Sequence, residues 1–459
     1  MTTSVKNIQS EVNSRLTAGG LSSLACCQLQ CAQTILNNGI KYSVANLASL
    51  PTASCNTGRL AYVESEKKYY WSDGITWSSN FTSTVSILRE IWSWGGNATG
   101  ALGIGNTVNS CSPVREMCSA SDWCSVSSGG GSEFKLALKT DGSLWSWGCN
   151  ACGQLGIGNV LNRCSPVREI CSASNWCQAV AGGNRQAFGI KTDGSLWAWG
   201  YNQCGSLGLG NYSTRCSPGR EFCSANNWCF VASGLRTTAA IKTDGTLWTW
   251  GYGRYGILQN GSTSFTSRSN AIQTNDAGNT WAKVQVGMCH MAALKTTGTI
   301  HTWGRGAAGE LGTGSFCSTG TGNIQQEGSG SASWCDLSVG GNGRHTLAVK
   351  TTGVLLGWGY NAFGQLGRGY TGNRNFPGYV SCGFTDWCRP AAGNLNSAGI
   401  RTNGSLWVWG SGGNGYLGNG KAANYCTPQR EICAFTNWCS ASMAGGGSAI
   451  RLNSRGFNV

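Results

Sequence analysis

The sequence predicts an all-β protein folded as a closed seven-bladed propeller, and three observations support this prediction. A W-x-W-G pattern, degenerate in two copies, occurs seven times at intervals of 51 to 55 residues, a period typical of propeller repeats. The 459 residues include 70 Gly and 21 Trp but only 11% charged residues, which favours short strands and tight turns over long surface helices. Finally, the last repeat lacks one strand, and an unpartnered copy of that strand lies near residue 90.

Residues 1–84 precede the repeat and divide into two segments. Two short helices are predicted, one ending near residue 18 and one over residues 21–37, because apolar residues recur at intervals of three and four. Helices this short are marginal alone, so we expect residues 1–40 to dock the protein into a larger assembly. Residues 41–84 are expected to form a small β-meander and a linker. The docking face of the first helix would consist of Val5, Ile8, Val12 and Leu16.

From residue 85 to 459 each unit is interpreted as four short strands, which together make one blade. In the third unit the β-favouring runs are 167–170, 178–181, 186–192 and 195–200. The last two form a hairpin, and its Asp193-Gly194 turn places Gly where a positive φ is needed.

The two ends of the repeat region are expected to share one blade. Gly447 to Gly456 matches the strand before the hairpin turn, but no W-x-W-G strand follows it. Ile87 to Gly95 is a W-x-W-G strand with no hairpin partner before it. Pairing these segments would close the ring and remove its exposed sheet edges.

The charge pattern does not predict a nucleic-acid partner. The net charge of +14 arises from 33 Lys and Arg against 19 Asp and Glu, without a run of five basic residues. Nucleic-acid binders concentrate their basic residues on one stripe. The first residues, MTTSVKNIQSEVNSRL, lack the apolar core of a signal peptide, and no stretch of about eighteen apolar residues occurs. We therefore expect synthesis in a cytoplasm and no membrane insertion.

The 24 cysteines follow the repeat, four times with the spacing C-x6-C-x5-C. A metal site would need four ligands, usually in closely spaced pairs, and only Cys149 and Cys152 have that spacing, so no metal is expected. Small buried thiols and disulfides remain, and disulfides that close the five-residue loop before a strand are favoured. The candidate disulfide cysteines are Cys118, Cys124, Cys171, Cys177, Cys223, Cys229, Cys382, Cys388, Cys433 and Cys439.

No catalytic or cofactor-binding residues are predicted, so we expect a protein that is not an enzyme. His290 and His345 share one repeat position and His301 replaces a Trp of W-x-W-G, which indicates structural roles. Nine of the 19 carboxylates occupy repeat positions, without a distinctive pair for hydrolysis. The segment 415–422 is close to a phosphate-binding loop but ends in Ala where Ser or Thr is required.

The blades resemble the regulator of chromosome condensation repeat family over residues 85–459. The resemblance is carried by K-T-D-G-S-L-W-A-W-G at 191–200, C-G-S-L-G at 204–208 and N-A-F-G-Q-L-G at 361–367. It implies a seven-bladed propeller but leaves the function open, since one fold serves many functions. Ultraviolet photoreceptors of this superfamily carry G-W-R-H-T repeats, and the corresponding segments here lack the Trp, so light sensing is not expected.

A second resemblance concerns residues 50–77. Leu50-Pro51, Gly58 to Val63 and Tyr69 to Trp77 are similar to a small β-motif near the start of tail-fibre and other virion proteins of marine bacteriophages. A virion is released into an oxidising medium, which would reconcile the many cysteines with the lack of a signal peptide. The resemblance implies a non-enzymatic virion protein, in which residues 1–84 contact other virion proteins and the propeller binds a host-surface glycan or protein.

In this hypothesis the receptor-binding loops lie where the repeat is most irregular, at 259–280 and 314–333, and a multicopy or homo-oligomeric virion would add avidity. One alternative is a capsid or tail component whose propeller only stabilises its neighbours. Another is a cellular regulator that binds a GTPase or chromatin, although the sequence contains no recognisable acidic or wedge-like insertion or basic tail. The candidate binding residues are Gln259, Asn260, Ser264, Phe265, Thr274, Asn275, Phe316, Asn323, Gln325 and Gln326.

Overall fold

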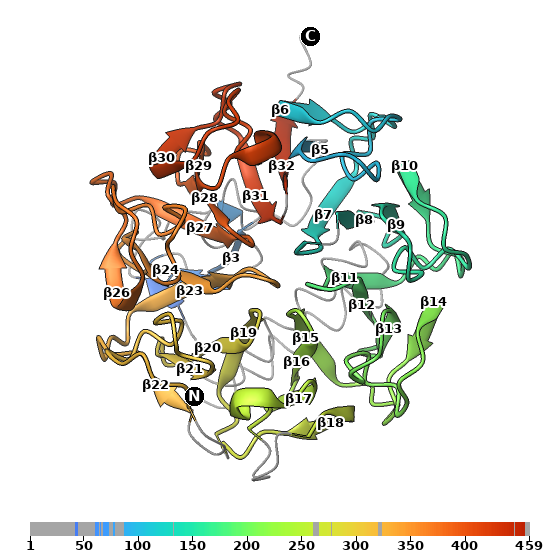
Figure 1. Cartoon of the computed structure of the whole chain (residues 1–459), viewed down its shortest axis with the longest axis horizontal. Helices are drawn as coiled ribbons and strands as arrows, with labels where there is room; N and C mark the ends of the chain where they lie inside the picture. The colour runs from blue at the N-terminus through green and yellow to red at the C-terminus, as the bar shows by residue number, and fades with distance from the viewer. Residues whose placement is uncertain are drawn as a thin grey trace.

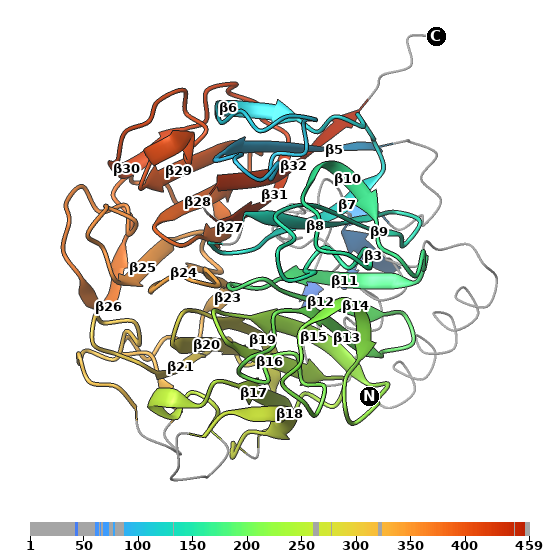
Figure 2. The ribbon, with the colours of Figure 1, turned by 45° about the vertical axis from the view of Figure 1, so that its right-hand side comes forward.

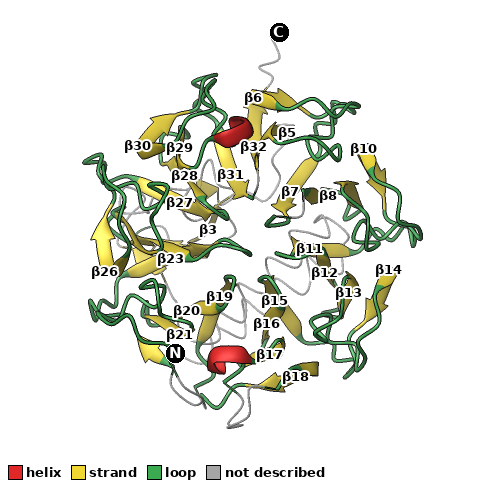
Figure 3. Ribbon diagram, viewed as in Figure 1, coloured by secondary structure: helices red, strands yellow, loops and turns green. Residues whose placement is uncertain are grey.

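A computed structural model describes residues 42–44, 60–63, 65, 68–72, 77–78, 87–131, 133–259, 266–276, 278–319, 324–444 and 446–454. Seven four-stranded antiparallel sheets are arranged as blades around a central axis (Figure 1). The predicted all-β propeller with seven four-stranded blades is therefore confirmed. Strands fill the ring and long loops cover its periphery (Figure 3), and the only helices among the described residues are two 3₁₀ turns, η3 (Arg254–Gly256) and η4 (Gly413–Gly415).

The blades are numbered in chain order, and their strands run from the innermost to the outermost. Blade 1 contains β31 (Trp438–Met443), β32 (Gly446–Ser454), β5 (Ile87–Gly95) and β6 (Ser110–Arg115); blade 2 contains β7 (Trp123–Ser128), β8 (Phe134–Lys139), β9 (Leu144–Gly148) and β10 (Arg163–Arg168); blade 3 contains β11 (Trp176–Ala181), β12 (Gln186–Lys191), β13 (Leu196–Gly200) and β14 (Arg215–Arg220). Blade 4 contains β15 (Trp228–Ser233), β16 (Thr237–Lys242), β17 (Leu247–Gly251) and β18 (Arg268–Gln273); blade 5 contains β19 (Trp281–Val286), β20 (His290–Lys295), β21 (Ile300–Gly304) and β22 (Gln325–Gln326). Blade 6 contains β23 (Trp334–Val339), β24 (His345–Lys350), β25 (Leu355–Gly359) and β26 (Arg374–Tyr379); blade 7 contains β27 (Trp387–Ala392), β28 (Asn396–Arg401), β29 (Leu406–Gly410) and β30 (Tyr425–Arg430).

The sequence repeat and the blade are offset by one strand. The run 167–170, predicted as the first strand of the third unit, overlaps β10, and β10 pairs with β9 of the preceding blade. Its place in the third blade is taken by β14, which pairs with β13. A long loop separates each outermost strand from the strand with which it pairs. The sequence analysis therefore assigned the outermost strand to the blade that follows it in the chain, and not to the blade that precedes it.

The ring closes as predicted. β32, at the C-terminal end, pairs with β5 in an antiparallel register from Gly446 opposite Gly95 to Ser454 opposite Ile87. The two strands lie side by side in Figure 2, although they come from opposite ends of the described propeller. Blade 1 therefore has all four strands only because both ends of the repeat region contribute.

Two tryptophans per blade form most of the core between blades. The first begins each innermost strand, and the second is the last Trp of W-x-W-G; Trp176 and Trp199 in blade 3 are both 0% exposed. Their rings lie 6.0 Å apart in a tilted arrangement. Because each indole also contacts the neighbouring blade, burial of these rings joins the seven sheets into one body.

Four described strands precede the propeller. β1 (Tyr42–Val44) pairs in parallel with β2 (Leu60–Val63), which continues antiparallel through β3 (Lys68–Ser72) to β4 (Trp77–Ser78). The predicted docking helices, with Val5, Ile8, Val12 and Leu16, lie outside the described residues. Within the described ranges, neither 3₁₀ turn is long and apolar enough to span a membrane.

Candidate protein-interaction surface

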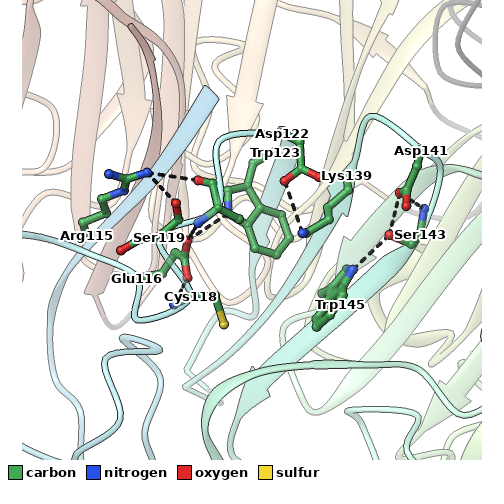
Figure 4. A network of polar contacts seen from close by, with 11 residues as sticks. Arg115, Glu116, Cys118, Ser119, Asp122, Trp123, Lys139, Asp141, Ser143 and Trp145 are labelled. Carbon is green, nitrogen blue, oxygen red and sulfur yellow. Dashed lines mark hydrogen bonds and ion pairs between the residues drawn. The ribbon is translucent and has the colours of Figure 1, made fainter. Parts of the chain in front are cut away.

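A buried glutamate organises the link between successive blades. Glu116, 1% exposed, accepts a hydrogen bond from Trp123 Nε1 at 3.1 Å. It also accepts the backbone N–H groups of Cys118 at 2.6 Å and Ala120 at 2.7 Å (Figure 4). A carboxylate is suited to this place because its two oxygens satisfy three donors, one of them the buried indole N–H of Trp123. The same indole-to-carboxylate bond, at 3.0 to 3.3 Å, recurs at Glu169, Glu221, Glu327 and Glu431.

The residue after this glutamate forms an exposed apolar surface on four consecutive blades. Ile432 follows β30 of blade 7, Met117 follows β6 of blade 1, and Ile170 and Phe222 follow the outermost strands of blades 2 and 3. These side chains are 53%, 61%, 54% and 62% exposed, respectively. We call these four residues the apolar arc. On the other three blades the same position is occupied by Asn275, Gly328 and Ser381.

Each side chain of the apolar arc is held against a glycine. Gly158 has a φ of 78°, and a Cβ added there would lie 2.5 Å from Ile170 Cδ1. Gly210 has a φ of 74°, and its added Cβ would lie 2.3 Å from the Phe222 ring. Glycine therefore suits the positive φ and leaves room for the close approach of these side chains.

Further apolar and basic groups accompany the apolar arc. Val108, Leu161 and Tyr212, in loops of blades 1 to 3, are 68%, 59% and 53% exposed. An arginine precedes each glutamate of these four links and donates from Nη2 to a carbonyl four residues ahead at 2.7 to 2.8 Å; the residues are Arg115, Arg168, Arg220 and Arg430. Exposed apolar groups accompanied by guanidinium groups are typical of protein-binding surfaces.

The central cavity offers less distinctive chemistry. About 260 Å³ of partly open space lies where the innermost strands of all seven blades meet, lined by small, polar and apolar side chains. One ion pair crosses between neighbouring strands there, Lys283 Nζ to Asp336 Oδ1 at 2.5 Å. No group of three or more His, Cys, Asp or Glu within the described part of the chain is arranged to hold a metal ion.

His290 and His345 lie between blades and are 1% and 0% exposed. His290 Nε2 is 3.3 Å from Thr346 Oγ1, and His345 Nε2 is 2.8 Å from Ser397 Oγ. Burial lowers the pKa of His290 to about 4 and that of His345 to about 3. Both imidazoles are therefore neutral near pH 7 and connect neighbouring blades by hydrogen bonds.

The predicted disulfides are wrong. Cys118, Cys124, Cys171, Cys223, Cys382, Cys433 and Cys439 are free thiols. Because the first cysteine of every candidate pair is free, none of the five bonds forms, including those to Cys177, Cys229 and Cys388. In the first pair Cys118 is exposed on the link, whereas Cys124 belongs to β7 and burial raises its pKa to about 12. The loop that such a disulfide would restrain is already held by Glu116.

The predicted binding loops are only partly brought together. Gln259 and Asn275 line one cavity, and the Asn275 N–H donates to the Gln259 carbonyl at 2.9 Å. Thr274 is buried beside them, whereas Phe316 is exposed in the loop after β21 and Gln325 and Gln326 form β22. Asn260, Ser264, Phe265 and Asn323 lie outside the described residues. The sequence interpretation missed the apolar arc, whose signal was an apolar residue after Arg-Glu in four units.

Sequence and structure comparisons agree on the class of propeller. The profile of the regulator of chromosome condensation (RCC1) repeat matches residues 90–133, 141–190 and 193–241, and a second profile of the same description matches 123–154 and 228–257. These matches support assignment of the repeats to the RCC1 repeat family.

Individual relatives are similar over most of this chain. The ultraviolet-B receptor UVR8 of Arabidopsis thaliana is 28% identical over 359 residues, covering 77% of this chain and 80% of the relative. The secretion-regulating guanine nucleotide exchange factor of Mus musculus is 28% identical over 386 residues, covering 76% and 79%. The crystal structure of Prp20p from Saccharomyces cerevisiae, described with its binding to Gsp1p and histones, aligns with a TM-score of 0.69 at 18% identity, covering 82% of this chain and 93% of that one.

These relatives are cellular proteins, so the prediction of a phage virion protein is wrong. Four further predictions that depended on it are also wrong: the tail-fibre or capsid role, the virion localisation, the contact of residues 1–84 with virion proteins, and the host-surface glycan or protein as receptor. The phage resemblance rested on residues 50–77, a short motif, whereas the cellular relatives match about three quarters of the chain.

Proposed function

We propose that this protein is a cellular regulator whose propeller binds another protein, and that this partner is a small GTPase. The carrying observation is the apolar arc, four exposed side chains at one repeat position of four consecutive blades. The name of the mouse relative, an exchange factor, supports the choice of partner. In this role the propeller acts through contact and not through covalent chemistry.

The apolar arc has the composition expected of an interface centre. Phe222 and Met117 supply large apolar contact areas, and aromatic, Met and Arg side chains are enriched at protein interfaces. Arg220 and Arg115 precede these links, so a complementary partner would present an apolar centre beside acidic groups. A rigid ring keeps this arrangement preorganised, which lowers the entropy lost on binding.

Regulation of a GTPase follows from differential affinity. A protein changes a nucleotide-exchange equilibrium only to the extent that it binds one nucleotide state more tightly than another. If the apolar arc contacts a surface that differs between the nucleotide-bound and nucleotide-free GTPase, binding of the propeller would favour release of the nucleotide.

The test uses the full chain and representative small GTPases of each subfamily, loaded with fluorescent GDP. We expect at least one GTPase to bind and to release its nucleotide faster in the presence of the protein. The double substitution Ile170→Ser and Phe222→Ser should weaken that binding at least about tenfold, because truncating central interface residues typically costs more than about 1 kcal/mol each.

The matched control is Tyr379→Ser in blade 6, since Tyr379 is 71% exposed but lies outside the apolar arc. This variant should bind as the unmodified protein does. Binding to histones without binding to any GTPase, or equal binding by the double variant, would overturn the proposal.

A further inference from the structure

The junction of blades 4 and 5 departs from the repeat at several neighbouring positions. Thr274 replaces the linking glutamate, Asp276 stands where five other links have an equivalent Cys, and His301 replaces the first Trp of W-x-W-G. Gln259 occupies a position that is Gly in the other six blades. Three of these four residues line one cavity of about 330 Å³, together with Asn275, Lys295 and Ile324.

The backbone at Gln259 is strained. Its φ is 48°, a left-handed conformation that is unfavourable for a residue with a side chain. The equivalent residues are glycines with φ between 63° and 71°, namely Gly103, Gly156, Gly208, Gly312, Gly367 and Gly418. Gln259 is 1% exposed, and its Nε2 donates to the Gly256 carbonyl at 2.9 Å. Strained residues of this kind cluster at ligand sites, because surrounding contacts must hold them.

Replacement of Trp by His opens the cavity. In blade 2 the Lys139 ammonium lies 5.2 Å from the Trp123 ring and 4.9 Å from the Trp145 ring (Figure 4). In blade 5 Lys295 retains the first contact, 4.7 Å from the Trp281 ring, but the second indole is replaced by the smaller His301 imidazole, whose centroid lies 5.6 Å from that of Trp281. Lys295 Nζ instead lies 2.9 Å from Asp276 Oδ2. A cation, an anion and an imidazole therefore line the cavity.

Two buried hydrogen-bond donors at the same junction have no acceptor among the described residues. Trp281 is 3% exposed and Thr274 is 5% exposed, yet Trp281 Nε1 and Thr274 Oγ1 have no hydrogen-bond partner among the described residues. At five other links a glutamate carboxylate accepts the indole N–H at 3.0 to 3.3 Å. The adjacent segments 260–265 and 320–323 contain no Asp or Glu that could replace it. The group missing from this junction is therefore a carboxylate.

We propose that the cavity between blades 4 and 5 binds a small carboxylate-bearing molecule, whose carboxylate takes the place of the missing glutamate. The carboxylate would lie near the Lys295 ammonium, which lines the cavity and also faces Asp276. It would accept hydrogen bonds from Trp281 Nε1 and the Thr274 hydroxyl, whose side chains do not line the cavity but lie next to residues that do. The remainder of the molecule would contact His301, whose Nδ1 also has no hydrogen-bond partner in the described part of the chain. A volume of about 330 Å³ suits a small metabolite and excludes a folded partner. The site is separate from the apolar arc, which lies on blades 7 and 1 to 3, and does not depend on the GTPase proposal.

Calorimetric titration and thermal unfolding of the full chain would test the site, with propionate, succinate and benzoate as probes and their amides as controls. We expect at least one carboxylate to bind saturably and to raise the melting temperature. The matched amide should bind at least about tenfold more weakly, since it lacks the charge that faces Lys295. If no probe carboxylate binds saturably, the proposal is wrong.

Two substitutions should abolish binding for different reasons. Thr274→Glu restores the internal carboxylate, and His301→Trp fills the cavity with the side chain found in other blades. Because either change restores the repeat, each should also raise the melting temperature of the unliganded protein. If the first variant does not fold, the second still decides the question. Binding that persists unchanged in the folded variants would overturn the proposal.

The matched control is Glu169→Thr at the junction of blades 2 and 3. It deprives Trp176 Nε1 of its acceptor, as in the proposed site, but Trp197 remains in the position that corresponds to His301. Without the cavity, this variant should gain no affinity for the carboxylates beyond that of the unmodified protein. An equal new affinity there would show that an unpaired indole alone suffices, and the cavity would be excluded as the determinant.

Discussion

Trp147 Nε1 of blade 2 donates a hydrogen bond to the carbonyl of Ala101 in blade 1 at 3.0 Å. The same contact, at 2.8 to 3.2 Å, joins each of the seven blades to the one before it, including blade 1 to blade 7 through Trp94 and Tyr416. A glycine of positive φ lies beneath each of six of these indoles, so hydrogen bonding and close packing act at the same place.

Gly156→Ala should destabilise the protein by about 2 to 4 kcal/mol. An added Cβ would lie 2.8 Å from Trp199 Nε1, and the φ of 68° is itself unfavourable for alanine. The control is Gly383→Ala, which has the same φ of 68° but no atom within 4 Å of the added Cβ, so it should cost only about 1 kcal/mol. Urea unfolding would measure both, and equal losses would exclude a packing role for Gly156.

Glu116→Ala should destabilise the protein by about 3 kcal/mol, because three donors, among them the buried indole N–H of Trp123, lose their acceptor. Asp122→Ala on the same link is the control. Asp122 forms a 3.2 Å ion pair with Lys139, but its side chain is 45% exposed, so its loss should cost at most about 1 kcal/mol. Comparable losses in chemical denaturation would contradict the structural role assigned to the glutamate.

Stability should fall as the pH is lowered from about 6.5 towards 4. His290 and His345 have lowered pKa values of about 4 and 3 in the folded protein, whereas the unfolded chain takes up protons from about pH 6.5. The unfolded state therefore binds more protons in this window, and each histidine reduces the free energy of unfolding by up to about 1.4 kcal/mol per pH unit. The double variant His290→Gln and His345→Asn should show a shallower slope in unfolding measured across this range.

Thiol reactivity should differ sharply between Cys118 and Cys124. Cys118 is exposed, whereas burial raises the pKa of Cys124 to about 12 and leaves almost no thiolate near pH 8. Alkylation of the native protein without reductant, followed by mass spectrometry, should label Cys118 at least about a hundredfold faster. Equal rates for the two thiols would mean that β7 opens readily in the native state.

The fold could be predicted because its pattern is repeated and because the surplus strand at Ile87 identified the partner of the last one. The blade to which each outermost strand belongs could not be predicted, because the pairing of β10 with β9 across the long loop between them leaves no local signal in the sequence. Cysteine spacing suggested disulfides, but spacing gives only the separation of two residues along the chain. The link is held instead by the Glu116 carboxylate, whose role becomes apparent only from its hydrogen bonds in the structure.

The sites were harder to predict than the fold. Gln259, Thr274 and Asn275 were selected for irregularity, and they do gather at one junction. The significance of His301 depended on knowing that its ring borders the same cavity. The apolar arc was missed because an apolar residue at a repeated position, such as Phe222, looks like part of the core until its exposure is known.

The one-strand offset between the repeat and the blade bears on how such a protein can evolve. Duplication or loss of one sequence repeat would add or remove strands in two adjacent blades. Every sheet could still be completed, because the neighbouring repeat would supply the missing strand. The pairing of β32 with β5 would still join the two ends of the repeat region, whatever the number of repeats between them. A gene of this design can therefore exchange, gain or diversify single repeats, as at the junction of blades 4 and 5, without leaving an unpaired strand.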